Sequence, residues 1–282
     1  MILVFGKTGQ VAMELQSVAN VIALDRDQAD LASPNECLDI IRSYNPSAVI
    51  NAAAYTAVDK AEDEEILATK INGKAPALMA QACFELNIPF VHISTDYVFE
   101  GLGNRPWKNN DLTYPCNAYG RSKLLGEEGI RSSGATYCIL RTSWIVSEHG
   151  VNFVKTMLRL SETRNKLDVV ADQIGGPSLA RDIAITCLII ADQLQKDPKK
   201  SGTYHYSGAP DVSWADFAAE IFHQSGRKII INPIKAEDYP TTAVRPLNSR
   251  LDCNVTEKTF GIKRPDWRKN LIHILQNLEV IK

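Results

Sequence analysis

The sequence predicts an α/β fold in which a doubly wound parallel sheet is followed by a smaller mixed α/β region. Two observations support this prediction. In the first half of the chain, short apolar runs alternate with helical segments. A glycine-rich turn follows the first apolar run and leads into a helical segment. Strands that alternate with helices form βαβ units, and such units give a parallel sheet with helices on both faces.

Five strands are expected in the first half, because each apolar run is too short for a helix and is bounded by turn or polar residues. They are Ile2–Phe5, Val21–Leu24, Ala48–Asn51, Phe90–Ser94 and Tyr137–Arg141. Between them, Ser33-Pro34-Asn35-Glu36 has the pattern of a capping box and predicts a helix over Cys37–Tyr44. The long helical stretch Glu64–Leu86 contains Gly73 and Pro76, so a kink or break is expected there.

The second half predicts a mixture of helices and strands. Helices are expected at Asn152–Glu162, Asp182–Gln195 and Trp214–Gln224. Strands are expected at Leu167–Ala171, Tyr204–Ser207 and Ile229–Asn232. The change of pattern divides the chain into residues 1–149 and 150–282, with the option that some later strands return to the first sheet.

The composition excludes several classes of protein. The 282 residues include 31 Lys and Arg against 33 Asp and Glu, and a net charge of −2 gives no basic surface for nucleic acid. The longest strongly apolar stretch, Ile183–Ala191, is too short to span a membrane. No basic region precedes an apolar segment at the N-terminus, so no signal peptide is expected. The six cysteines are scattered without a C-x-x-C pair, which favours a reducing, cytoplasmic setting over a disulfide or zinc framework.

The segment from Gly6 to Ala12 has the form G-x-x-G-x-x-A and lies between a strand and a helix. In Rossmann-type folds, one glycine allows a tight turn, another lets backbone N–H groups approach a pyrophosphate, and a small third residue lets helix and strand pack closely. The helix N-terminus adds partial positive charge toward the phosphates. The small residues Ala52, Ala53 and Ala54 after the third strand would let the chain lie close to the same cofactor. We therefore expect residues 1–149 to bind a dinucleotide and residues 150–282 mainly to bind the substrate.

The end of the second strand bears on the choice of cofactor. Asp25 lies 19 residues after Gly6, where an acidic residue would bind the ribose 2′-hydroxyl of NAD. Arg26 follows it and could instead hold the 2′-phosphate of NADP. Because the two residues indicate different cofactors, the preference between NAD and NADP stays open. Asp30 is compatible with either a solvated surface position or an adenine contact.

Tyr119 and Lys123 form a Y-x-x-x-K motif, which places both side chains on one face of a helix. A Lys ammonium beside a phenol lowers the pKa of the phenol, so that the Tyr can exchange a proton with a carbonyl or alcohol oxygen. A lone motif of this kind is more often a pair of surface residues. Here it follows the glycine turn and Thr95, whose hydroxyl ends the fourth strand, where ligands bind in doubly wound sheets.

Together these residues resemble the extended short-chain dehydrogenases/reductases, and longer blocks resemble the dTDP-4-dehydrorhamnose reductase family. The blocks keep the order and spacing of the family over nearly the whole chain. They are Phe5–Val11, Asn51–Glu62, Ser94–Phe99, Arg141–Trp144, Asn152–Leu158 and Arg245–Asp252. The resemblance implies reduction of the 4-keto group of a dTDP-linked 6-deoxy sugar with NADPH or NADH, in the synthesis of dTDP-L-rhamnose for cell-surface polysaccharide.

The same resemblance assigns roles to residues. Tyr119 would protonate the 4-oxygen as the hydride arrives, Lys123 would lower the pKa of Tyr119 and hold the nicotinamide ribose, and Thr95 would orient the carbonyl. The candidate cofactor contacts are Gly6, Thr8, Gly9, Gln10, Val11, Asp25, Arg26, Asp30, Leu31, Ala52, Ala53, Ala54, Tyr119 and Lys123. The candidate substrate contacts are Thr95, Asp96, Tyr97, Tyr119, Trp144, Asn152, Gln173, Arg245, Ser249 and Arg250. The arginines suit a diphosphate by charge and bidentate geometry.

The chain also departs from the family pattern. Ala12 stands where the family often has a third glycine, and Tyr55 stands where a His often lies. Some members bind Mg²⁺ through glutamates at a dimer interface. Glu14 matches one such position, but Ser178–Asp182 supplies no clear second glutamate. Mg²⁺ is therefore an option that is not predicted as required, and the oligomeric state, monomer or homodimer, stays open.

Two other functions are compatible with these motifs. A relative of the family is the regulatory subunit of methionine adenosyltransferase, so a non-catalytic NADP-binding subunit is one alternative. A reductase of another nucleotide-linked 4-keto sugar is the other.

Overall fold

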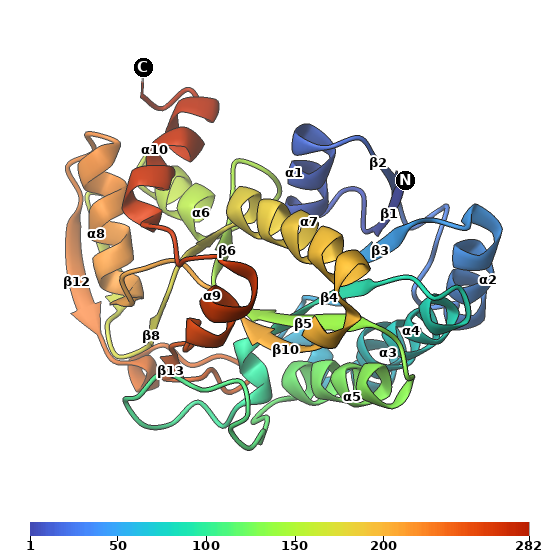
Figure 1. The fold of residues 1–282 in the computed structure, drawn as a ribbon. Coiled ribbons are helices and arrows are strands. Elements are labelled where there is room, and N and C mark those ends of the chain that lie inside the picture. Colours follow the sequence, from blue (N-terminus) through green and yellow to red (C-terminus); the bar gives the residue numbers. More distant parts are fainter. Residues whose placement is uncertain (282) are drawn as a thin grey trace.

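In the computed structural model, which describes residues 1–281, the five strands predicted for the first half form one parallel sheet (Figure 1). A sixth strand from the second half, β10, extends it. The order across the sheet is β10-β5-β4-β3-β1-β2, and each neighbouring pair is parallel. The strands are β1 (Ile2–Phe5), β2 (Val21–Leu24), β3 (Ala48–Asn51), β4 (Phe90–Thr95), β5 (Tyr137–Thr142) and β10 (Gly202–His205). The α/β prediction is confirmed.

Helices cover both faces of this sheet because its strands point alternate apolar residues to opposite sides. On one face, α1 (Gln10–Val18) and α7 (Ala180–Lys196) pack against strand residues such as Val4. On the other, α2 (Pro34–Tyr44), α4 (Ala75–Glu85) and α5 (Ala118–Ser132) pack against the neighbouring positions. In Figure 1, α1 and α7 lie above the sheet and α4 and α5 below it.

The start of α2 differs from the predicted capping box. Ser33 occupies the N-cap position before Pro34, but its side chain makes no capping hydrogen bond. Asp30 holds this turn instead, because its carboxylate accepts from the Ala32 N–H and its carbonyl accepts from the Ser33 N–H. The predicted helix is present, and only its capping was wrong.

The break expected within Glu64–Leu86 is confirmed, and it takes the form of a π-helical turn. The short helix α3 (Glu65–Thr69) runs into the π-helical turn η2 (Lys70–Lys74), and α4 begins directly afterwards with Pro76 in its first turn. A proline is tolerated there because the first N–H groups of a helix have no intrahelical acceptor. The turn directs the Asn72 side chain to the Ser122 hydroxyl on α5, 3.0 Å away.

The second half forms its own apolar core around three helices and a two-stranded sheet. These elements are α6 (Phe153–Leu160), α8 (Trp214–Gln224), α10 (Trp267–Asn277), β7 (Lys166–Val170) and β12 (Ile230–Ile234). The shorter elements are β6 (Ile145–Val146), β8 (Ile174–Gly175), β9 (Ser178–Leu179), β11 (Val212–Ser213), β13 (Asn248–Ser249) and α9 (Asn254–Phe260). Among them, α9 packs its Phe260 in the apolar cluster of the first sheet. The single-turn 3-10 helices are η1 (Lys60–Glu62), η3 (Asp96–Val98), η4 (Pro198–Lys200) and η5 (Ala236–Asp238).

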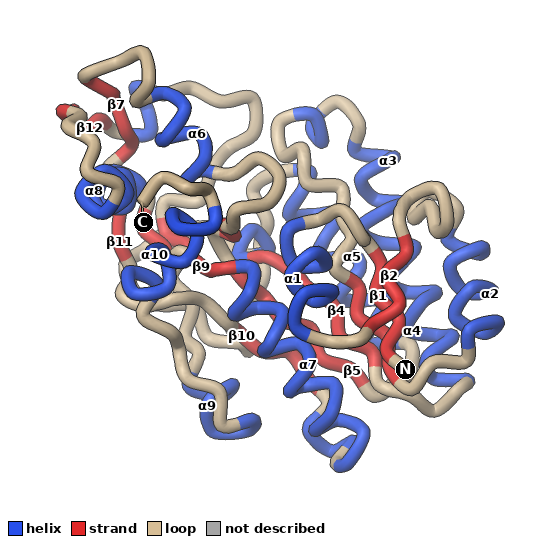
Figure 2. The backbone as a smooth tube through the Cα atoms, turned by 90° about the horizontal axis from the view of Figure 1, so that it is seen from above, coloured by secondary structure: helices blue, strands red, loops and turns tan. Residues whose placement is uncertain are grey.

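The two halves of the sequence are interleaved in space. Both α7 and β10 come from the second half of the chain, yet both pack in the first sheet, as Figure 2 shows. No helix formed by residues 1–281 is long and apolar enough to cross a membrane.

Candidate active site

The residues predicted to form the site lie at one edge of the parallel sheet. The glycine turn follows β1, Asp25 follows β2, Ala52 follows β3 and Thr95 ends β4. Ligands of doubly wound sheets bind outside the carboxyl ends of the strands, at the point where the strand order reverses. In the order β2-β1-β3-β4-β5, that point lies between β1 and β3. The glycine turn and the run of alanines therefore flank the expected binding position.

The glycine turn has the geometry that its sequence predicts. Gly6 has a φ of 99°, and a Cβ at this position would lie 2.9 Å from Ala53 Cα, so a larger residue does not fit. The N–H of Gly9 donates to the Gly6 carbonyl at 2.7 Å, and α1 begins at the next residue without a side-chain cap. The first N–H groups of α1 therefore stand at the carboxyl edge of the sheet, where they fit the phosphates of a dinucleotide.

Five of the other candidate cofactor contacts either form ion pairs or are buried in the core. Lys7 pairs with Asp25 at 3.6 Å and Arg26 pairs with Asp30 at 3.5 Å, and the Arg26 side chain is 75% exposed. Val11 and Leu31 are buried in the two apolar clusters that flank the sheet, so their side chains pack in the core. For these two residues, the predicted cofactor contact would have to be made by the backbone.

Thr95, Asp96, Tyr97 and Tyr119 come together at the end of β4. The Thr95 hydroxyl accepts from the Tyr97 N–H at 3.2 Å and donates to Asp96 Oδ1 at 3.3 Å. The rings of Tyr97 and Tyr119 meet edge to face, with centroids 5.6 Å apart. Burial raises the pKa of Tyr119 above its ordinary value, Asp96 and Tyr97 raise it further, and the Thr95 hydroxyl lowers it.

Lys123 lies one turn after Tyr119 on α5 and is completely buried. Its Nζ lies 2.9 Å from His92 Nε2 and 2.8 Å from the carbonyl oxygen of Ile93. Burial lowers the pKa of Lys123 to about 7, and Glu127 opposes this shift. In this structure the Lys123 amine is turned toward β4, and burial is the largest influence on the pKa of Tyr119. The expected effect of Lys123 on the pKa of Tyr119 therefore stays a prediction.

The sequence did not predict two polar residues near Lys123. His92 contacts Lys123 directly, and Asn51 contacts His92. His92 lies within the apolar run of β4, and Asn51 Nδ2 lies 3.1 Å from His92 Nδ1. Both residues are fully buried. A polar residue inside an otherwise apolar strand was the available signal, because a buried polar group needs a partner.

Asp96 faces the segment that contains Ser249 and Arg245. Burial raises the pKa of Asp96 to about 7, and the nearby Ser249 hydroxyl opposes this shift. Asp96 Oδ2 is buried and has no hydrogen-bond partner among the described residues. Arg245 pairs with Asp59 at 2.5 Å and donates to the Tyr97 hydroxyl at 3.5 Å. Asp59 is therefore a further polar residue near the end of β4. Of this ion pair, only Arg245 was predicted as a site residue.

The remaining substrate candidates are spread more widely. Trp144 has a φ of 48°, a conformation rare for a bulky residue, and its ring stacks on Trp214 with centroids 3.5 Å apart. Arg250 donates to Asn248 at 2.9 Å. Gln173 lies between β7 and β8. The structure places all three side chains in or beside the second half of the chain.

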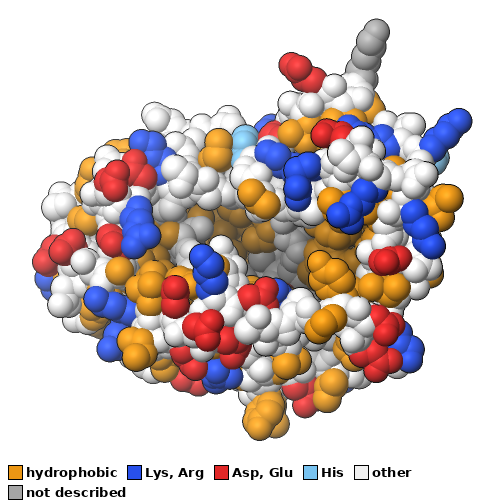
Figure 3. Space-filling view, turned by 180° about the vertical axis from the view of Figure 1, so that it is seen from behind, with side chains coloured by type: hydrophobic (Ala, Val, Ile, Leu, Met, Phe, Trp, Pro, Cys, Tyr) orange, Lys and Arg blue, Asp and Glu red, His pale blue; other side chains and the backbone are white. Residues whose placement is uncertain are grey.

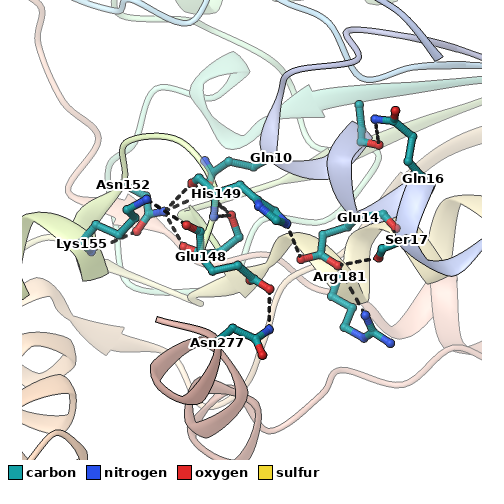
Figure 4. Close-up of polar contacts among 12 residues, drawn as sticks. Gln10, Glu14, Gln16, Ser17, Glu148, His149, Asn152, Lys155, Arg181 and Asn277 are labelled. Carbon is teal, nitrogen blue, oxygen red and sulfur yellow. Dashed lines mark hydrogen bonds and ion pairs between the residues drawn. The ribbon is translucent and has the colours of Figure 1, made fainter. Parts of the chain in front are cut away.

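Asn152 is occupied by contacts within the protein. Its amide nitrogen donates to Gln10 Oε1 at 3.0 Å and to the carbonyls of Ser147 and His149, and its oxygen accepts from the Lys155 N–H (Figure 4). The side chain therefore caps α6 and joins it to the glycine turn.

A polar cluster around Glu14 lies beside these contacts (Figure 4). The Glu14 carboxylate is buried between His149, at 3.3 Å, and Arg181, at 3.5 Å. Ligand-type atoms of Glu14, Glu148 and His149 all lie within 4.8 Å of one another. Glu148 accepts from Asn277 on α10 at 2.5 Å. Glu148 was not predicted as a neighbour of Glu14, and Arg181 supplies a positive charge directly to this cluster.

A hollow between the two halves of the molecule is visible in Figure 3, with apolar side chains on its walls and charged side chains around its rim. A phenol and an amine one helical turn apart, beside a dinucleotide-binding turn, are the arrangement that short-chain dehydrogenases/reductases use for proton transfer to a carbonyl. The fold and the site place the chain in this class of NAD(P)-dependent oxidoreductases.

Comparison with known proteins narrows the class. Residues 1–280 match the family of the RmlD substrate binding domain. The dTDP-4-dehydrorhamnose reductase of Sinorhizobium fredii is 42% identical over 95% of this chain and 94% of its own length. A solved dTDP-4-dehydrorhamnose reductase from Clostridium acetobutylicum is 36% identical with a TM-score of 0.92, over 99% of both chains. One from Bacillus anthracis, solved in complex with NADP, is 32% identical with a TM-score of 0.91, over 98% of both chains. The chain belongs to the dTDP-4-dehydrorhamnose reductase family.

Proposed function

We propose that this chain reduces the 4-keto group of dTDP-4-dehydrorhamnose with NAD(P)H and releases dTDP-L-rhamnose, in the cytoplasm. The observation that carries the proposal is the grouping of Thr95, Asp96 and Tyr119 at the end of β4, with Lys123 one turn further along α5, in a chain that matches reductases of this name over nearly its full length.

The glycine turn fits the cofactor. Gly6 and Gly9 leave room for the backbone to approach a pyrophosphate, and the N-terminus of α1 supplies N–H donors. Asp25 and Arg26 follow β2 and would contact the adenine ribose or its 2′-phosphate. When bound, NAD(P)H supplies the hydride that reduces the carbonyl carbon.

The protein's own groups supply the proton. Because its pKa is raised, Tyr119 keeps its proton at neutral pH, as the general acid of a reduction requires. The Thr95 hydroxyl lies beside Tyr119 and would orient the carbonyl oxygen. Arg245 and Arg250 lie on the segment that faces Asp96 and Tyr97, where their charges suit the diphosphate of the substrate.

The proposal is tested by following NAD(P)H oxidation with dTDP-, UDP- and GDP-linked 4-keto sugars. We expect turnover with dTDP-4-dehydrorhamnose, and a loss of about 10²–10⁴-fold in kcat for Tyr119→Phe, because the phenol proton is removed while the ring remains. The half-buried Tyr137 lies at the start of β5, away from the site, so Tyr137→Phe is a matched control that should keep full activity. Tight cofactor binding without turnover on any of these sugars would instead support a regulatory subunit.

A further inference from the structure

Lys123 is bonded to groups that belong to the sheet. Residues Asn51 on β3 and His92 on β4 are register partners, and both are fully buried. A chain of hydrogen bonds runs from the Asn51 amide through the His92 ring to Lys123 Nζ, with lengths of 3.1 Å and 2.9 Å. None of the roles described above uses Asn51 or His92.

The orientation of the Asn51 amide fixes the direction of the first bond. Asn51 Oδ1 accepts from the backbone N–H of Ala53 at 3.1 Å. The amide nitrogen, which can only donate, therefore faces His92 Nδ1. Turning the amide over would set two donors against each other at Ala53. His92 Nδ1 is thus an acceptor and carries no proton.

The direction of the second bond follows from the first. Burial, together with the nearby Lys123, holds the pKa of His92 well below its ordinary value, so the ring is neutral and its proton lies on Nε2. This N–H points at Lys123 Nζ. An ammonium has three donors and no acceptor, so it cannot receive a hydrogen bond, whereas an amine can accept from His92 with its lone pair and donate to the Ile93 carbonyl.

We propose that Asn51 and His92 are positioning residues that control the protonation state of Lys123: Asn51 selects the Nε2–H tautomer of His92, and His92 then holds Lys123 as an amine. The part that concerns turnover rests on the proposed function, while the tautomer is a property of the chain alone. Two other titratable groups on α5 lie near Lys123. Glu127 is one turn further along α5 and is bonded to Arg141 and Arg131, and Tyr119 is one turn before.

The first test is direct and needs no substrate. The ring nitrogens of the five histidines can be observed by ¹⁵N NMR in protein without added cofactor, with His92 assigned by the signal that His92→Gln removes. We expect His92 to carry its proton on Nε2 between pH 6 and 8. In Asn51→Asp, one carboxylate oxygen keeps the Ala53 bond and the other accepts from Nδ1–H, so the tautomer should reverse. A proton on Nδ1 in the unmodified protein would overturn the proposal.

The second test measures cofactor affinity against pH. Below a pH of about 7, Lys123 is protonated and can offer its charge to a cofactor, and above it the charge is lost. We expect the Kd for NADH and NADPH to rise as the pH passes this value. Reversing the tautomer makes His92 Nε2 an acceptor for the ammonium, so Asn51→Asp should move the midpoint upward by at least one pH unit. Comparing each variant with the unmodified protein cancels the ionisation of the cofactor itself.

Two further variants keep the proposal falsifiable if Asn51→Asp does not fold. His92→Gln can present an amide oxygen to Lys123 and should also move the midpoint upward. His205 is equally buried in the same sheet but bonds to the Trp107 carbonyl and Arg141, so His205→Gln should leave the midpoint unchanged. An unshifted midpoint in the folded Asn51 or His92 variant overturns the proposal. The expected tautomer in a protein that reduces no keto sugar would refute only the proposed function.

Discussion

Lys123 and Glu127 lie one turn apart on α5, and both are completely buried. The groups around Glu127 stabilise its charged form, whereas the groups around Lys123 favour its neutral form. Glu127 accepts from Arg141 at 2.6 and 2.9 Å, from Arg131 at 2.6 Å and from Ser94 at 2.7 Å. Lys123 is bonded only to neutral groups of β4 among the described residues.

The pKa values follow the partners. Burial raises the pKa of Glu127, but the hydrogen bonds and charges of the two arginines outweigh it, so the pKa is lowered and the carboxylate stays ionised. Burial lowers the pKa of Lys123, and no bonded anion restores it. Equal burial therefore produces a fixed ion pair at one position and an amine that titrates near neutral pH one turn away. The first suits a structural role and the second suits a reactive one.

The largest effect is expected from removing one side of the ion pair. Arg141→Met leaves the Glu127 carboxylate buried with only Arg131 and Ser94, and should reduce the free energy of unfolding by about 3–5 kcal/mol. Urea unfolding at pH 7 measures it. Arg42 forms an exposed pair with Glu85, so Arg42→Met should change the same quantity by less than about 1 kcal/mol. Equal losses of unfolding free energy in the two variants would show that the buried ion pair stabilises the fold no more than the exposed one.

An intermediate effect is expected at Lys123, and it depends on pH. The pKa of Lys123 is about 7 in the folded chain against an ordinary 10.5, so between these values the unfolded chain binds a proton that the folded chain lacks. The free energy of unfolding should therefore rise with pH over this range, by up to about 1.4 kcal/mol per pH unit from this group. Lys123→Met removes the contribution.

The measurement is urea unfolding of both proteins at pH 7 and pH 9. The advantage of Lys123→Met over the unmodified chain should shrink as the pH rises. Lys196 is 72% exposed on α7, so Lys196→Met should leave the pH dependence as it is. A constant difference between Lys123→Met and the unmodified protein would mean that Lys123 keeps its charge when the chain folds.

The smallest effect is expected at Arg131, which shares Glu127 with Arg141. Its side chain is 34% exposed, so water screens and replaces part of the interaction. Arg131→Met should lower the free energy of unfolding by about 1 kcal/mol or less in the same urea assay. A loss as large as that of Arg141→Met would contradict the view that burial of the cation sets the strength of this pair.

Much of this molecule could be predicted from local pattern. The strands β1, β2 and β3 have the predicted bounds, because short apolar runs between turns leave few alternatives. Gly6, Thr95, Tyr119 and Lys123 could be singled out because their chemistry depends on spacing within one or two turns of chain.

The polar partners of these residues could not be predicted in this way. His92 is 31 residues from Lys123, and Asn51 is 41 residues from His92, so only the parallel register of β3 and β4 brings them together. Likewise Arg141 meets Glu127 because β5 lies beside β4 under α5. The capping of α2 was predicted wrongly for a related reason. Asp30, rather than Ser33, holds the start of this helix, and it does so through a turn that the local sequence does not specify.

The return of α7 and β10 to the first sheet has a consequence for attempts to divide the protein. A fragment that ends near residue 150 would lose β10, so β5 would become an unpaired edge strand, and it would lose the helix that covers one face of the sheet beside α1. Exposed edges and uncovered apolar faces promote aggregation. The cofactor-binding half is therefore not a portable module, and a chimera that exchanges substrate specificity should keep 180–205 with the original sheet.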